Sequence, residues 1–171
     1  MHMIKLLLML LLTYPGPIYS LSFYDSQGNL MHFSDFAGKK ILLVNTATAS
    51  SRAGQYASLE QLYEMYKDSL VVIAFPSDDF GHEKGNDSTI RQAVIGQCAI
   101  HFILASKISV SGDGQDAVYQ WLTQAALNGR ASNAVKNDFY KFLIDGAGNW
   151  MGVFSDDVDP MSQQIQDAIK L

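Results

Sequence analysis

Ser50, His82 and Asp138 have the three kinds of side chain that together can hydrolyse an ester or an amide. In such a site the hydroxyl attacks the carbonyl, the imidazole takes its proton and the carboxylate orients the imidazole. The sequence contains no Gly-x-Ser-x-Gly segment, the sharp turn that exposes the nucleophile in one large class of hydrolases. The three residues therefore remain a coincidence of types until their geometry is known.

Cys98 is the single cysteine of the chain, and it limits the chemistry that sulfur can do. One thiol excludes an internal disulfide and any zinc site built from several thiolates. We expect Cys98 to be a small, half-buried thiol, as free cysteines usually are. His101 follows three residues later, but side chains at that spacing on a strand need not meet.

The composition predicts one folded domain. The chain has 171 residues, of which 48% are hydrophobic and 17% charged, so a disordered chain is excluded. The formal net charge of −5 argues against a sequence-independent grip on nucleic acid phosphates.

A strand–helix–strand unit is predicted around the candidate residues. Residues 41–47 and 71–76 are continuous apolar runs, which are typical of strands buried on both faces. Between them, Leu59, Leu62 and Tyr63 form part of one apolar stripe at helical spacing. Such a unit predicts two parallel strands joined by a right-handed crossover.

The remaining pattern completes an α/β sandwich with a central mixed sheet flanked by helices. A turn at 26–29 joins two short strands, and a second turn at 145–148 joins strands at 139–145 and 149–154. Helices are predicted over 88–97 and 115–127. A last helix is predicted to open at Asp159-Pro160, with the aspartate as its N-cap.

Residues 1–20 are predicted to be a secretory signal peptide. Lys5 precedes a seven-residue apolar run over 6–12, and Pro15, Pro17 and Ser20 follow it. The run is too short for a stable membrane span, which needs about 20 residues. We therefore expect a domain over 21–171 that is secreted or periplasmic.

Four segments resemble the glutathione peroxidase family. Residues 38–48 resemble its Gly-Lys-x-x-Leu-x-Val-Asn-Val-Ala-Ser segment, and 62–68 resemble its Leu-Tyr-Glu-Lys-Tyr-Lys-Asp helix. Residues 75–81 resemble its Phe-Pro-Cys-Asn-Gln-Phe-Gly loop, and 139–143 resemble the end of Trp-Asn-Phe-x-Lys-Phe-Leu. The resemblance runs from about residue 22 to 171 and implies a thioredoxin-like fold. The short stretch between residues 127 and 139 is similar to that of the family's compact, monomeric members.

The resemblance implies thiol-dependent reduction of hydroperoxides, with glutathione or thioredoxin as the reductant. The family's peroxidatic cysteine or selenocysteine falls on Ser50, and its Gln, Trp and Asn fall on Glu83, Asn137 and Asp138. A second loop cysteine, present in many members, falls on Ser77. All four catalytic positions are thus substituted. We expect no cofactor and no bound metal.

These substitutions predict a copy with weak or absent peroxidase activity. A serine oxygen cannot cycle through a sulfenic acid, which is the oxidised form of the family's catalytic sulfur. Glu83 and Asp138 replace hydrogen-bond donors with ionised acceptors. Such a copy would act as a binding module for a peptide, a partner or a cation.

Two alternatives stay open. The chain could be an atypical thiol-dependent peroxidase, active in the response to oxidative stress, in which Cys98 supplies the sulfur. Separately, Asp78, Asp79, Glu83 and Asp138 could converge as an acidic group that binds calcium or magnesium through oxygen ligands. No recognised calcium-binding loop supports the second alternative, and a solvated acidic loop explains these residues better.

Overall fold

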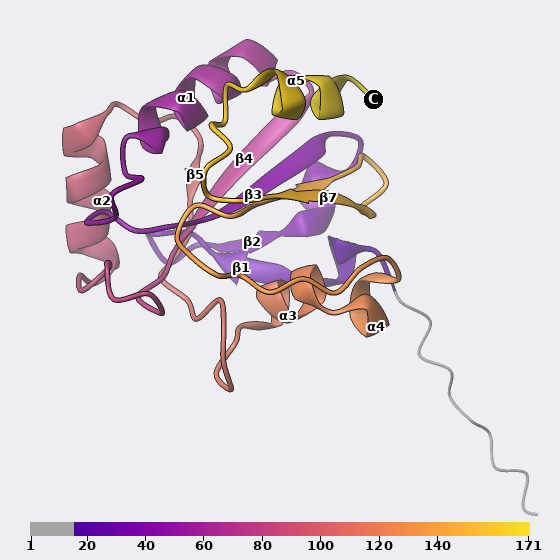
Figure 1. Cartoon of the computed structure of the whole chain (residues 1–171), viewed down its shortest axis with the longest axis horizontal. Helices are drawn as coiled ribbons and strands as arrows, with labels where there is room; N and C mark the ends of the chain where they lie inside the picture. The colour runs from indigo at the N-terminus through magenta and orange to yellow at the C-terminus, as the bar shows by residue number, and fades with distance from the viewer. Residues whose placement is uncertain (1–15) are drawn as a thin grey trace, which may run out of the picture.

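The computed structural model describes residues 16–171 and builds them around one five-stranded sheet (Figure 1). The strands are β1 (Ser22–Tyr24), β2 (Leu30–His32), β3 (Lys40–Thr46), β4 (Leu70–Pro76), β5 (Ile103–Leu104), β6 (Lys141–Ile144) and β7 (Trp150–Phe154). The α-helices are α1 (Gln55–Tyr66), α2 (Asp87–Gln97), α3 (Ala117–Thr123), α4 (Ala125–Asn128) and α5 (Gln163–Lys170). Short 3-10 helices cover Ile18–Ser20 and Phe33–Phe36.

The large sheet is mixed and has the order β5-β4-β3-β6-β7. Strand β3 pairs in parallel with β4, and β4 pairs in parallel with β5. Strand β6 is antiparallel to both β3 and β7. The predicted parallel unit built from β3, α1 and β4 is therefore confirmed, and β1 and β2 form a separate hairpin.

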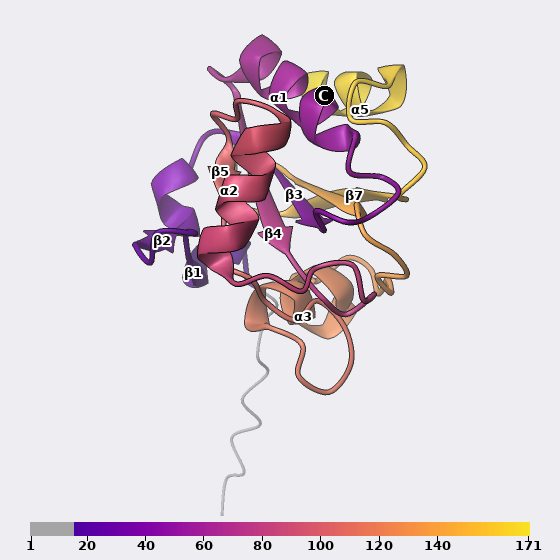
Figure 2. The ribbon, with the colours of Figure 1, turned by 90° about the vertical axis from the view of Figure 1, so that its left-hand side faces the viewer.

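Strand β3 separates two hydrophobic clusters because its side chains alternate between the two faces of the sheet. Leu42 and Val44 join the cluster that includes Leu59 of α1 and the apolar face of α5. Ile41 and Leu43 join the opposite cluster with α3. Figure 1 shows α1 and α5 above the sheet and α3 and α4 below it, and the turned view in Figure 2 again has α1 and α5 above the strands and α3 below them. The predicted α/β sandwich is therefore confirmed.

Three local predictions are wrong. The two-residue strand β5 was not predicted, because so short a strand has no sequence period of its own. The helix predicted over 115–127 is broken at Gln124, which has an extended backbone. The last helix begins at Gln163 with Ser162 as its N-cap, since Asp159 instead accepts a hydrogen bond from the Met161 backbone.

Residues 16–20 are part of the folded domain, whereas the sequence predicted that the domain begins at residue 21. Ile18 is fully buried in the cluster around α3, and its backbone N–H donates to the Gly148 carbonyl over 3.0 Å. The Trp121 indole N–H donates to the Gly16 carbonyl over 2.9 Å. Residues 1–15, which make up most of the predicted leader, lie outside the described residues. Across residues 16–171, no helix has the length and apolar content needed to cross a membrane.

Lys141 is a charged side chain inside the protein, and it gives the fold a testable pH dependence. It is fully buried at the start of β6, and its ammonium donates to the Ser155 and Val158 carbonyls. Burial lowers the pKa of Lys141 to about 8, although the charge of Asp156 opposes this shift.

We expect Lys141 to raise the free energy of unfolding by about 2 kcal/mol between pH 7 and pH 9.5 relative to Lys141→Met, a comparison that cancels the opposite effect of the raised Cys98 pKa. Above the lowered pKa the folded chain releases the Lys141 proton, while the unfolded chain still holds it, so alkali favours the folded state. Urea unfolding at several pH values measures the rise, and Lys141→Met is the control that should remove it. Equal pH slopes in the two proteins would contradict the prediction. Measurements stop below pH 10, where the raised pKa values of the buried Tyr56 and Tyr119 act in the opposite direction.

Candidate functional site

The four candidate site positions predicted from the resemblance lie in three loops at one end of the sheet. Strands β3 and β4 are parallel, so their carboxyl ends meet at the same edge, and the antiparallel β6 begins there. Ser50 lies in the loop after β3, Glu83 in the loop after β4, and Asn137 and Asp138 immediately before β6. The structure therefore brings together loops that are about 90 residues apart in sequence.

Ser50 lies on the turn that leads into α1 and is almost buried, with a relative exposure of 9%. Its Oγ accepts a hydrogen bond from the Arg52 backbone N–H over 3.2 Å. Its backbone N–H donates to the Ala47 carbonyl over 3.3 Å, which holds the turn. The hydroxyl is thus engaged within its own turn.

Glu83 joins the loop after β4 to the loop after β3. Its carboxylate accepts hydrogen bonds from the Thr48 backbone N–H and from Thr48 Oγ1, both over 2.7 Å. The side chain is buried, at 2% exposure. A buried carboxylate that accepts two such bonds is well satisfied, so Glu83 is a structural clamp in this geometry.

His82 and Asp138 form the shortest contact between these loops. His82 Nδ1 lies 2.6 Å from Asp138 Oδ2, and the Ala49 N–H donates to the His82 carbonyl over 3.1 Å. Asp138 is fully buried and its Oδ1 has no hydrogen-bond partner, whereas the His82 side chain is 46% exposed. The structure therefore joins the base and the orienting acid of the hydrolase hypothesis, but no hydrogen bond links His82 to Ser50 among the described residues.

Asn137 closes a ring of contacts back to the Ser50 turn. Its Nδ2 donates to Asp156 Oδ2 over 3.2 Å, and Arg52 Nη2 lies 3.3 Å from the same oxygen. Its Oδ1 accepts from the Asp138 N–H over 3.0 Å. We call Ser50, His82, Glu83, Asn137 and Asp138 the three-loop cluster.

The backbone that carries Asn137 and Asp138 is held in a left-handed turn at Phe139, whose φ is +66°. The fully buried Asn45 fixes this turn, because its amide donates to the Asn137 carbonyl and accepts from the Tyr140 N–H, each over 3.0 Å. The Phe139 ring packs edge-on against Tyr56 of α1 at 5.3 Å between ring centroids. The strain of positive φ in a non-glycine residue is therefore offset by tertiary contacts.

A hollow of about 300 Å³ lies beside the three-loop cluster. Glu83 and His82 line it together with Thr48, Ala49 and Lys84, whereas Ser50, Asn137 and Asp138 do not. The cluster therefore presents part of its surface to a ligand-sized space and keeps the rest within the loops.

The acidic group proposed from sequence does not converge, which corrects the calcium or magnesium hypothesis. Asp79 turns away and accepts from the Val110 and Ser111 N–H groups over 2.6 and 2.8 Å. Asp78 pairs with Lys84 at 3.0 Å, and this hydrogen bond lowers the pKa of the Asp78 carboxyl. Glu83 accepts from Thr48 and Asp138 Oδ2 contacts His82, so these two carboxylates have separate partners and do not share one site.

Cys98 is the C-cap of α2 and does not line the hollow beside the three-loop cluster. Its backbone N–H donates to the Val94 carbonyl, and its half-buried side chain packs against the core cluster beneath α1. Burial, with a smaller contribution from the charge of Glu60, raises the pKa of the thiol. Less thiolate is therefore present at neutral pH, which disfavours Cys98 as a peroxidatic nucleophile.

Two features of the described chain were missed from sequence. The link from Arg52 through Asp156 to Asn137 has no local signal, because it joins residues about 100 positions apart. Glu60 and Glu64 form a group with His101, and their i, i+4 spacing on a predicted helix was a usable signal.

Comparisons with known proteins agree with this geometry. The family model described as glutathione peroxidase matches residues 18–123. A glutathione peroxidase-like peroxiredoxin of Saccharomyces cerevisiae is 33% identical over 156 residues, covering 89% of this chain and 96% of the yeast protein. A glutathione peroxidase of Lactococcus lactis subsp. cremoris is 32% identical over 154 residues, with the same coverage of 89% and 96%.

Solved structures give the same picture of the fold. The crystal structure of Trgpx in its apo form superposes with a TM-score of 0.71 at 29% identity and covers 92% of this chain and 98% of that one. A thioredoxin-family thiol:disulfide interchange protein from Chlorobium tepidum superposes with a TM-score of 0.63 at 15% identity, covering 92% and 98% of the two chains. The second likeness shows that the fold is thioredoxin-like.

Proposed function

Because the chain belongs to the glutathione peroxidase family, whose members reduce hydroperoxides with thiols, we propose that it keeps this fold and has lost the thiol chemistry. The observation that carries the proposal is the oxygen of Ser50 in the loop after β3, where the family's motif has sulfur or selenium. In the family's reaction, the sulfur bonds to one peroxide oxygen as the O–O bond breaks, and a thiol then reduces the sulfenic acid. A serine hydroxyl has no corresponding oxidised state.

The surroundings of Ser50 support the same conclusion. Glu83 and Asp138 are buried carboxylates that only accept hydrogen bonds when ionised, so they do not stabilise an anion. Two such charges would also raise the pKa of any thiol placed at residue 50. The substitutions therefore act together against a thiolate.

We infer that the three-loop cluster and its hollow bind a polar peptide segment of a partner protein. The hollow has both signs of charge at its lining, since Lys84 and the exposed His82 lie beside the clamped Glu83. A leader that ends before the folded residues 16–20, shorter than the one predicted over residues 1–20, would make the periplasm or the exterior of the cell the expected place of action.

Peroxide turnover tests the loss of thiol chemistry. We expect the protein and its Ser50→Cys variant both to reduce hydrogen peroxide no faster than Cys98→Ser does, with either glutathione or thioredoxin as reductant. A coupled NADPH assay measures the rate. Turnover by the unmodified protein well above that of Cys98→Ser would reject the proposal and favour the second candidate, an atypical peroxidase that uses the lone thiol.

A further inference from the structure

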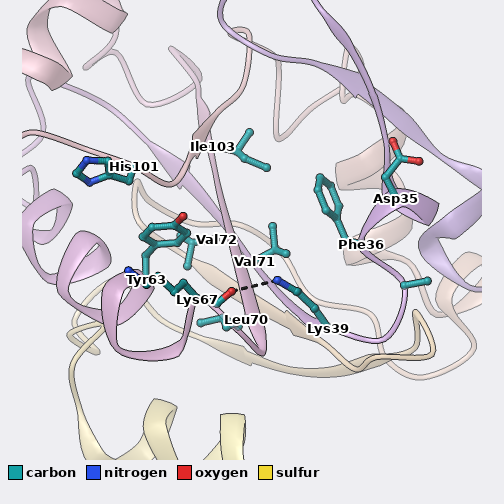
Figure 3. A pocket seen from close by; sticks show the side chains of 11 residues that line it. Asp35, Phe36, Lys39, Tyr63, Lys67, Leu70, Val71, Val72, His101 and Ile103 are labelled. Carbon is teal, nitrogen blue, oxygen red and sulfur yellow. Dashed lines mark hydrogen bonds between the residues drawn. The ribbon is translucent and has the colours of Figure 1, made fainter.

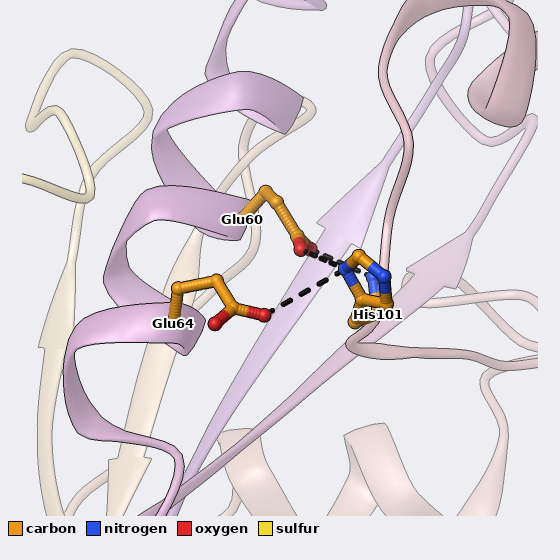
Figure 4. Close-up of side chains that lie close together, drawn as sticks. All are labelled: Glu60, Glu64 and His101. Carbon is orange, nitrogen blue, oxygen red and sulfur yellow. Dashed lines mark hydrogen bonds and ion pairs between the residues drawn. The ribbon is translucent and has the colours of Figure 1, made fainter.

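The strongest unassigned group lies at the other end of the sheet, on α1 and before β5. Glu60 and Glu64 are one turn apart on α1, and His101 lies two residues before β5 (Figure 4). One ligand atom of each of the three residues lies within 4.8 Å of the others. We propose that Glu60, Glu64 and His101 bind one divalent transition-metal ion, and that Zn²⁺ is the ion best matched to them.

The donor set distinguishes this group from a solvated acidic patch. An imidazole nitrogen with two carboxylates is a ligand combination that zinc accepts, whereas calcium and magnesium take oxygen ligands. Three protein ligands leave at least one coordination position for water. The site is therefore of the open kind, and it differs from the thiol chemistry of the family.

The three side chains are already arranged around one point. Glu60 accepts a hydrogen bond from the His101 backbone N–H over 2.8 Å, and its other oxygen lies 2.6 Å from His101 Nδ1. Glu64 Oε1 lies 3.7 Å from the same nitrogen. An ion that replaces the proton at Nδ1 would thus meet both carboxylates after small side-chain rotations.

Access to this point is open. The side chains of His101 and Glu64 are 65% and 46% exposed. The Glu60 side chain is only 14% exposed, so neighbouring atoms hold it in position. His101 also lines a hollow of about 270 Å³ together with Tyr63, Lys67 and residues that begin β4 (Figure 3). The open coordination position can therefore hold water or a small ligand from this hollow.

Two existing side-chain pairs must open when a metal ion binds. In this structure Glu60 pairs with the imidazole, and Lys67 Nζ lies 2.8 Å from the Glu64 carboxylate. The Glu64–Lys67 pair lies at the surface, where such a contact contributes little, whereas the Glu60–His101 pair is the stronger competitor because Glu60 is mostly buried. A divalent ion with a direct bond to each ligand offers more, so displacement is favourable.

Calorimetric titration of the full chain with ZnCl₂, after removal of metals with a chelator, tests the site. We expect one Zn²⁺ per chain, and we expect His101→Ala and Glu64→Gln each to weaken binding by at least about 10-fold, since even outer-shell groups have effects of this size. His32→Gln and Asp68→Asn, which change exposed residues outside the group, should bind as the unmodified protein does. Glu64→Gln is exposed and nearly isosteric, and circular dichroism checks that it folds.

Four results would overturn the proposal. The first is no zinc binding, and the second is equal affinity in His101→Ala and the unmodified protein. The third is complete displacement of zinc by millimolar calcium, which would show that the carboxylates bind the ion without the imidazole. Loss of binding in Cys98→Ser with retention in His101→Ala would likewise move the ion to the thiol. None of these outcomes depends on peroxide turnover, so the test is independent of the proposed function.

Discussion

A fourfold variant should reduce hydrogen peroxide at least about 100-fold faster than Ser50→Cys alone. This combined variant carries Ser50→Cys, Glu83→Gln, Asn137→Trp and Asp138→Asn. The single change supplies sulfur but leaves it beside two carboxylates, which disfavour the thiolate. Glu83→Gln and Asp138→Asn replace carboxylate acceptors with amides that can donate, and Asn137→Trp introduces the indole donor that the family motif places there. Each donor aimed at a developing anion typically contributes a factor of about 10²–10³.

The structure indicates that these changes can be accommodated. Gln at residue 83 can still accept from the Thr48 N–H, and Asn at 138 can still contact His82. Asn137 is only partly buried, so a larger ring at this position can extend toward solvent. A Cys98→Ser background ensures that the new thiol alone reacts. A folded combined variant that remains as slow as Ser50→Cys would show that the family positions were carried over incorrectly.

A chain that begins at Leu21 should be less stable than one that begins at Gly16 by at least about 3 kcal/mol. The longer chain buries Ile18 completely, and loss of a buried aliphatic side chain of this size costs about 2–5 kcal/mol. It also supplies the carbonyl that accepts the Trp121 indole N–H, and the Tyr19 hydroxyl that donates to the Gly146 carbonyl over 2.7 Å. Without residue 16, the indole N–H loses its acceptor.

Urea unfolding of the two chains measures this difference. The Ile18→Ala variant of the longer chain is the matched control and should account for most of the loss. Equal stability of the two chains would mean that residues 16–20 add nothing to the fold, and the boundary predicted at residue 21 would then be adequate.

Sequence periodicity predicted the parts of the fold that are locally encoded. The buried strands β3 and β4 are continuous apolar runs, and the stripe on α1 has helical spacing, so both are visible within short windows. The break at Gln124 and the strand β5 are not visible in this way, because neighbouring elements impose them. Ile18 was assigned to a leader because its burial depends on contacts near Gly148, about 130 residues away.

The sequence indicated which residues form the candidate site, but it did not indicate which side chains contact one another there. The resemblance located Ser50, Glu83, Asn137 and Asp138, and the strand directions bring them to one end of the sheet. It did not indicate that Glu83 would clamp Thr48 or that Asp138 would face His82. Those choices are made by side-chain packing across loops, which a single sequence does not record.

The left-handed turn at Phe139 has a consequence for how this surface evolves and associates. Asn45 binds the backbone on both sides of the turn and Tyr56 packs against the Phe139 ring, so much of its shape is fixed by residues other than 137 and 138. A partner that docks here as proposed would meet a preorganised surface and lose little conformational entropy. The same rigidity lets mutation exchange one chemistry for another on an unchanged frame.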